Sequence, residues 1–96
     1  MATTVVLHRV ADYPRWRKVY DEFEPVQKTG GVIKESVYQS KDDPNNVLVL
    51  HTFSTMAQAE SFLANPELKS AMERGGVEGH PRIEIFDEAK APVATA

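Results

Sequence analysis

Histidine is the residue type in this chain that can exchange a proton near neutral pH, and the chain has three histidines. His8 and His51 lie inside two apolar segments, where a polar ring must find a hydrogen-bond partner. His51 is therefore either a satisfied core or interface histidine or a group that contacts a ligand and takes a proton from it. His80 stands beside Pro81, and we expect it at the surface.

The pairing expected between two neighbouring strands would bring hydroxyl groups close to His51. A hairpin centred on Asp43 and Pro44 places Ser36 opposite His51 and Tyr38 opposite Val49. His51, Ser36 and Tyr38 would then form the polar wall of a pocket. The opposite face would be plain core, made of Ile33, Val37, Leu48 and Leu50, and a slip of one residue in register would scramble both sets.

Trp16, Tyr20 and Phe23 recur at the spacing of one helical face. Such a stripe is either a core face packed on a sheet or a slot that holds a planar ligand, and the two interpretations are compatible. A ligand between this helix and the strands would meet these rings and the histidines together.

Several other chemistries are excluded by what the sequence lacks. The chain has no cysteine, its paired glycines follow helical segments and end them, and its histidines stand on separate strands without paired spacing. We therefore expect no metal and no cofactor. The net charge of −3 is spread along the chain, which argues against nucleic acid or a membrane as partner. Without a basic start or a long apolar run, a soluble cytoplasmic protein is expected.

The elements that must position these residues alternate between strands and amphipathic helices. Asp12 is an N-cap for the helix that carries the aromatic stripe, and Pro25 is expected to kink or end it before Gly30. Thr55 caps a second helix, which Asn65 and Pro66 break and restart. The expected strands are Thr4 to Val10, Val32 to Ser40, Val47 to Phe53 and Pro81 to Asp87.

The order β-α-β-β-α-β places the first and third strands in the middle of a four-stranded antiparallel sheet of an α+β, ferredoxin-like domain. Both central strands are apolar on both faces, although helices can cover only one face. A second copy of the chain is the expected cover for the other face. We expect the domain to span residues 1–88 and residues 89–96 to form a flexible or strap-like tail. The expected contacts between copies include Val6, Val10, Val49 or Phe53.

Up to about Phe86, the chain resembles small bacterial proteins of the dimeric α/β-barrel superfamily that are related to the antibiotic-biosynthesis monooxygenase domain. The resemblance rests on Asp12 to Arg17, Gly31 and Val32, Ser40 to Asn45, the helix from Ala59 to Met72 with its break at Asn65 to Leu68, and Gly75 to Val77. It implies a homodimer. The haem-binding relatives place their axial histidine on a helix, whereas both helical regions here lack histidine, so haem is not expected.

The resemblance leaves two classes of function open. One is a small-molecule enzyme similar to cofactor-independent monooxygenases that act on quinols or anthrones. His51 would accept the proton, Ser36 or Tyr38 would orient a substrate oxygen, and the remaining substrate contacts would be His8, Trp16, Tyr20 and Phe23. The other is a homodimer without catalytic activity that binds a small hydrophobic metabolite, or a stress-associated protein.

Overall fold

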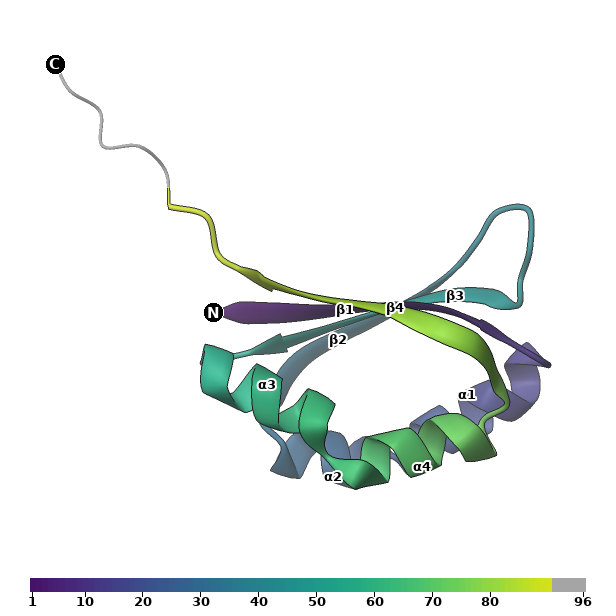
Figure 1. Ribbon diagram of the computed structural model, residues 1–96, viewed down its shortest axis with the longest axis horizontal. Coiled ribbons are helices and arrows are strands. Elements are labelled where there is room, and N and C mark those ends of the chain that lie inside the picture. The colour runs from purple at the N-terminus through teal and green to yellow at the C-terminus, as the bar shows by residue number, and fades with distance from the viewer. Residues whose placement is uncertain (91–96) are drawn as a thin grey trace, which may run out of the picture.

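The first strand of the chain lies inside a four-stranded antiparallel sheet of order β2-β3-β1-β4. The computed structural model describes residues 1–90 of the chain. The strands are β1 (Ala2–Val10), β2 (Val32–Gln39), β3 (Asn46–Phe53) and β4 (Val77–Asp87). The helices pack on one side of this sheet (Figure 1). The predicted ferredoxin-like arrangement, with the first and third strands in the middle, is confirmed.

Two helices occupy the first crossover, because a proline interrupts the helical segment. The first, α1 (Tyr13–Glu22), begins after Asp12, whose side chain accepts a hydrogen bond from the backbone N–H of Arg15. The second, α2 (Glu24–Thr29), has Pro25 in its first turn, where the missing N–H costs no helical hydrogen bond. The predicted break at this proline is confirmed, and Phe23, the last residue of the aromatic stripe, lies between the two helices.

The second crossover also contains two helices. The first, α3 (Met56–Ala64), starts with a capping box: the hydroxyl of Thr55 accepts from the N–H of Gln58, and the Gln58 side chain accepts from the N–H of Thr55. The second, α4 (Pro66–Arg74), starts at Asn65, which ends α3 in an extended conformation and accepts from the N–H of Glu67. The predicted break at Asn65 and Pro66 is confirmed.

The last strand begins earlier than the sequence suggested. It starts at Val77 rather than Pro81, so His80 lies within β4, where it is exposed as expected. Beside this segment the pairing of β1 with β4 shifts between Leu7 and Arg9. The irregular pairing leaves His8 without a paired residue on β4.

The pairing of β2 with β3 differs by one residue from the predicted register. Glu35, and not Ser36, lies opposite His51, while Ser36 pairs with Leu50 and Tyr38 with Leu48. Directly paired residues point to the same side of a sheet, so the register prediction was wrong and the two predicted faces are exchanged along β2. The six-residue connection closes with a hydrogen bond from Ser40 N–H to the carbonyl of Asn46.

The sheet face beneath the helices carries the core. Its residues form two clusters, one around Phe53 and Phe62 and one around Trp16 and Val47. Four residues that we expected at a contact between two copies are buried here, under the chain's own helices, and that expectation was wrong: Val6, Val10, Val49 and Phe53.

No helix of residues 1–90 covers the opposite face of the sheet (Figure 1). This face is rich in apolar side chains. Strand alternation puts Leu7, Tyr38 and Phe86 on this face, and they are between 36% and 54% exposed. Val5, Leu48 and Leu50 lie between them and are half-buried. The observation that both central strands are apolar on both faces therefore holds in the structure, with a different set of residues on the open side.

The predicted tail at 89–96 falls mostly outside the described residues, which end at residue 90. Within the described part of the chain, the helices are too short and too polar to cross a membrane.

Candidate functional site

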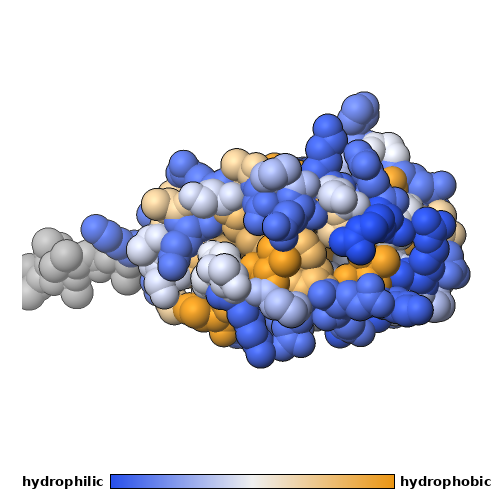
Figure 2. All heavy atoms as spheres, turned by 90° about the horizontal axis from the view of Figure 1, so that it is seen from below, coloured by the Kyte–Doolittle hydropathy of each residue, from blue (hydrophilic) through white to orange (hydrophobic). Residues whose placement is uncertain are grey.

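A narrow pocket lies between the sheet and the helical layer, where the two core clusters meet. Its open space is about 50 Å³. Figure 2 looks onto the helical side of the molecule and shows hydrophobic surface in the middle of that side, bordered by hydrophilic residues. The side chains that line the pocket come from β1, β3 and the helical segments, and they are Thr4, Val6, His8, Trp16, Val19, Tyr20, Phe23, Gln27, Val49, His51, Phe62, Leu63, Leu68, Ala71 and Met72.

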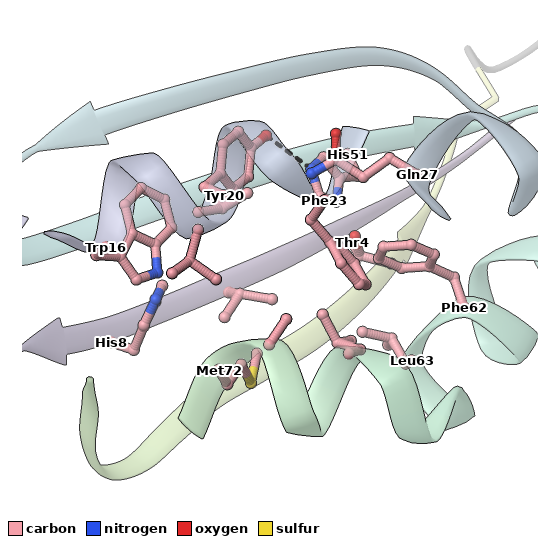
Figure 3. A pocket seen from close by; sticks show the side chains of 15 residues that line it. Thr4, His8, Trp16, Tyr20, Phe23, Gln27, His51, Phe62, Leu63 and Met72 are labelled. Atoms are coloured by element: carbon pink, nitrogen blue, oxygen red, sulfur yellow. Dashed lines mark hydrogen bonds between the residues drawn. The ribbon is translucent and has the colours of Figure 1, made fainter. Parts of the chain in front are cut away.

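A row of aromatic rings follows one wall of this pocket. Trp16 stacks on Tyr20 with ring centres 4.9 Å apart, and Tyr20 lies nearly parallel to His51 at 6.0 Å. His8 meets the indole of Trp16 edge-on at 5.5 Å. The row therefore has a histidine at each end, as Figure 3 shows. Flat rings in this arrangement favour a planar, apolar ligand with polar groups at its ends.

Four polar side chains stand in this otherwise apolar environment, each at most 5% exposed: Thr4, His8, Gln27 and His51. Within residues 1–90, neither ring nitrogen of His8 has a hydrogen-bond partner, and the same holds for Thr4 Oγ1 and Gln27 Nε2. Buried polar atoms in folded proteins nearly always have a partner. Because these atoms belong to residues that line a pocket, a ligand or water in the pocket would supply the missing bonds.

His51 has a defined partner at one ring nitrogen. Its Nε2 lies 3.0 Å from the hydroxyl of Tyr20. Burial lowers the pKa of His51 to about 4, and the negative charge of Glu35 opposes this shift. Burial also lowers the pKa of His8. The backbone at Val6 and Val47 raises this pKa, but by less than burial lowers it. Both rings are therefore neutral at pH 7 and can accept a proton or a hydrogen bond.

Tyr20 connects His51 to an acidic residue at the surface. The Tyr20 hydroxyl donates a hydrogen bond to Glu35 Oε2, and Glu35 lies directly opposite His51 on the neighbouring strand. Burial, together with the bond and the charge of Glu35, raises the pKa of Tyr20 well above its usual range. Tyr20 is therefore held in its protonated form between a carboxylate and an imidazole.

A second, more open hollow of about 210 Å³ lies on the outer side of Tyr20 and Glu35. It shares Tyr20 and Gln27 with the first pocket, and Glu35 lies on its wall. Tyr20 and Gln27 therefore separate the buried pocket from a solvent-facing depression. The other residues around the depression are largely charged: Asp21, Glu24, Lys28 and Lys34, with Val32 and Ile33.

The structure brings together five of the residues that sequence reasoning selected, and it separates two others from them. His8, Trp16, Tyr20, Phe23 and His51 line the same pocket. Ser36 and Tyr38 point to the open face of the sheet, away from His51, because the register differs by one residue from the expected one.

Sequence reasoning missed three polar residues of this site. Glu35 takes the place opposite His51 that had been assigned to Ser36. Thr4 stands four residues before His8 on the inward side of β1, so the alternation of that strand could have found it. Gln27 continues the spacing of Tyr20 and Phe23 beyond the proline break, which is why the pattern of α1 alone did not include it.

Acidic and imidazole side chains do not gather into a group of three or more that could hold a metal ion anywhere in residues 1–90. The polar residues that line the pocket, among them two histidines, can supply proton transfer and hydrogen bonding.

Sequence comparison with models of known protein families finds no match. Comparison with curated protein sequences finds none either.

Solved structures share the fold over nearly the whole chain. SnoaB from Streptomyces nogalater, described as a cofactor-independent oxygenase, has a TM-score of 0.75 at 12% identity, covering 97% of each chain. A protein of Caulobacter crescentus, named as a candidate antibiotic biosynthesis monooxygenase, has a TM-score of 0.74 at 20% identity, covering 93% of this chain and 90% of its own. A similarly named protein of Nitrosomonas europaea has a TM-score of 0.73 at 15% identity, with coverage of 94% and 100%. These similarities establish a shared fold and bear out the predicted resemblance at that level.

Proposed function

We propose that this protein is a cofactor-independent oxygenase that acts on a small quinol or anthrone and uses His51 as its base. The observation that carries the proposal is a neutral, buried histidine in an aromatic-lined pocket where, within residues 1–90, polar atoms of Thr4, His8 and Gln27 have no hydrogen-bond partner. The shared fold with SnoaB, a protein described as a cofactor-independent oxygenase, supports the same class.

The proposed reaction needs a base and a dry pocket rather than a cofactor. His51 takes a proton from the substrate and leaves an electron-rich anion, which passes electrons to O₂ and forms a carbon–oxygen bond. The resulting peroxide receives the proton back from His51 and loses water as the carbonyl forms. For an anthrone, one CH₂ group and O₂ become one C=O group and H₂O, so atoms and electrons balance.

The other pocket residues have roles in binding within this proposal. Trp16, Tyr20 and Phe23 contact the faces and edges of the substrate rings. Thr4 and Gln27 lie at the same end as His51 (Figure 3), where they would hydrogen-bond the oxygen that carries the developing negative charge. His8, at the other end, would bind a second polar group of the substrate.

The volume of the pocket sets a condition on this proposal. The open space of about 50 Å³ is too small for several fused rings, so such a substrate requires side chains to move. Leu68 and Met72 on α4 line the pocket and are only half-buried, and the unbranched chain of Met72 adapts readily to new shapes. We therefore expect substrates with as few as one or two rings to be active.

Oxygen uptake with metal-free protein tests the proposal. The panel contains one-ring and two-ring quinols, anthrone and 1,8-dihydroxyanthrone. His51→Gln should lower turnover by roughly 10²- to 10⁴-fold, the usual contribution of a positioned general base. His80→Gln, at an exposed histidine, is the matched control and should leave turnover unchanged. Uptake that is equal in the wild type and His51→Gln would contradict the role of His51.

The same measurement separates the proposal from its alternative, a protein that binds a small hydrophobic metabolite without reaction. The small open space and the hydrogen bond between His51 and Tyr20 favour this alternative. Quenching of Trp16, the single tryptophan, by quinones would report binding in the pocket. Binding without oxygen uptake across the whole panel would support the alternative and contradict the oxygenase.

We also propose that the functional unit is a homodimer joined through the open face of the sheet. Apolar side chains on that face would otherwise stay in contact with water: Val5, Leu7, Tyr38, Leu48, Leu50 and Phe86. A second copy of the same face offers a surface of matching character and size. Burial of these side chains would add stability to a chain of 96 residues, whose single core is small.

A further inference from the structure

The hydrogen bonds around Tyr20 determine which nitrogen of His51 carries a proton. A tyrosine hydroxyl has one proton, and a carboxylate has none to give. The proton between Tyr20 and Glu35 must therefore come from Tyr20. The Tyr20 oxygen then faces His51 Nε2 with a lone pair, at 3.0 Å, so this contact is a hydrogen bond only if Nε2 carries the proton. In the neutral ring, Nδ1 is left without a proton.

The remaining nitrogen is the one available for chemistry. Among residues 1–90 the side-chain hydrogen bond of the His51 ring is made at Nε2, and Nδ1 is not one of the enclosed polar atoms without a partner. The ring lines the buried pocket, so Nδ1 is the ring nitrogen left for a molecule bound there. An unprotonated nitrogen in this position can accept a proton from a bound molecule.

We propose that Glu35 and Tyr20 are positioning residues that hold His51 in the tautomer with Nε2 protonated and Nδ1 free to act as the base. The inference deepens the proposed function and rests on it for the role of Nδ1. The tautomer itself is a property of the protein without ligand, and it can be measured without any turnover.

The position of each partner follows from the fold. Register places Glu35 directly opposite His51 on the neighbouring strand, on the sheet face that the helices cover. Tyr20 reaches this pair from α1, where its ring is fixed by stacking on Trp16 and by the guanidinium of Arg17, which lies 5.3 Å from the ring centre. Three different elements therefore converge on one hydrogen-bonded chain.

The hydrogen bonds that link Glu35, Tyr20 and His51 also determine what happens when Nδ1 takes a proton. The ring becomes a cation in a buried site, which is unfavourable without a nearby negative charge. Nε2 keeps its hydrogen bond to Tyr20, and the carboxylate of Glu35 lies at the other end of that bond. Glu35 is the charged group that favours the protonated ring, while Tyr20 keeps its own proton throughout.

Nuclear magnetic resonance of protein with ¹⁵N- and ¹³C-labelled histidine tests the proposal directly at pH 7.5 without substrate. The signals of the three rings are assigned with His8→Gln and His80→Gln. In the wild type, His51 should show the tautomer with Nε2 protonated. Tyr20→Phe should shift His51 away from this tautomer, and Glu35→Gln should lower the pH at which the ring titrates.

Tyr38→Phe is the matched control, because Tyr38 lies on the opposite face of the sheet and should leave the His51 signals unchanged. A wild-type ring protonated at Nδ1 would overturn the proposal, as would a tautomer that is unaffected by Tyr20→Phe in a folded protein. Far-ultraviolet circular dichroism checks the fold of each variant.

An activity measurement then separates this proposal from the proposed function. If the wild type consumes oxygen with 1,8-dihydroxyanthrone, Glu35→Gln should lower kcat by roughly 10-fold and leave KM nearly unchanged, since Glu35 acts through His51 and does not contact the substrate. Absence of oxygen uptake would contradict the proposed oxygenase activity. The tautomer of His51 measured by nuclear magnetic resonance would still show whether Tyr20 and Glu35 position the ring.

Discussion

Lowering the pH from 7 to 4 should reduce the free energy of unfolding by about 3 kcal/mol through His51 alone. The pKa of this ring falls from its ordinary value of 6.5 to about 4 in the fold, chiefly through burial. One pKa unit corresponds to about 1.4 kcal/mol of difference between the protonation states. Folding therefore becomes less favourable once the unfolded chain can bind a proton that the folded ring resists.

The sign of the effect follows from the lowered pKa. Above pH 6.5 the ring is neutral in both the folded and the unfolded chain, and its contribution to stability is complete. Between pH 6.5 and 4 the unfolded chain binds a proton that the folded chain does not, so the free energy of unfolding falls. Below pH 4 both forms are protonated, and the loss from this ring reaches its limit. His8, whose pKa is also lowered, adds a loss of the same sign.

Urea unfolding between pH 7.5 and 4, followed by the fluorescence of Trp16, measures this loss. Protein concentration is held fixed, because association of two chains would also affect stability. Other groups titrate in this range, so the comparison is between the wild type and His51→Gln, whose side chain cannot titrate. The wild type should lose about 3 kcal/mol more than His51→Gln, and His80→Gln should follow the wild type. Parallel curves for the wild type and His51→Gln would show that the ring is not held neutral in the fold.

Two further predictions concern assembly and helix capping. Leu50→Lys places a charge on the open sheet face and should convert a wild-type dimer into a monomer in sedimentation at micromolar concentration, while Ala57→Lys on the exposed side of α3 should not. A wild-type protein that sediments as a stable monomer would contradict the proposed dimer. Thr55→Ala removes the hydroxyl of the α3 capping box and should lower the free energy of unfolding by about 1 kcal/mol. Ser54→Ala is the control, and equal stability of the two variants would contradict a stabilising cap.

The element order could be predicted because local chemistry determines where each element begins and ends. Asp12, Thr55 and Asn65 cap helices, and Pro25 and Pro66 lie at the breaks. The alternation of apolar residues likewise identified the two central strands. These signals depend on residues within a few positions of one another, so they can be seen without the tertiary structure.

The site could be predicted only in part, because it depends on pairing between strands. The residues from Ser40 to Asn46 are rich in turn formers, but they do not reveal which pair of strand residues closes the hairpin. In the structure, Asp43 forms backbone and side-chain hydrogen bonds within this turn and an ion pair with Arg9 on β1. Contacts of this kind set a register that the hairpin sequence alone does not specify. The difference of one residue removed Ser36 and Tyr38 from the site and placed Glu35 in it.

The pocket draws its polar lining from the first part of the chain alone, whereas its apolar lining comes from both halves. Every lining residue that can hydrogen-bond lies between positions 4 and 51, whereas α3 and α4 contribute only Phe62, Leu63, Leu68, Ala71 and Met72. The second pair of helices thus helps to set the room available to a ligand without supplying polar groups, and the sheet with the first pair supplies the proton chemistry. Substitutions in α4 can change which molecules enter without disturbing His51 and its partners. In evolutionary terms, ligand range and reactivity can diverge independently in this fold.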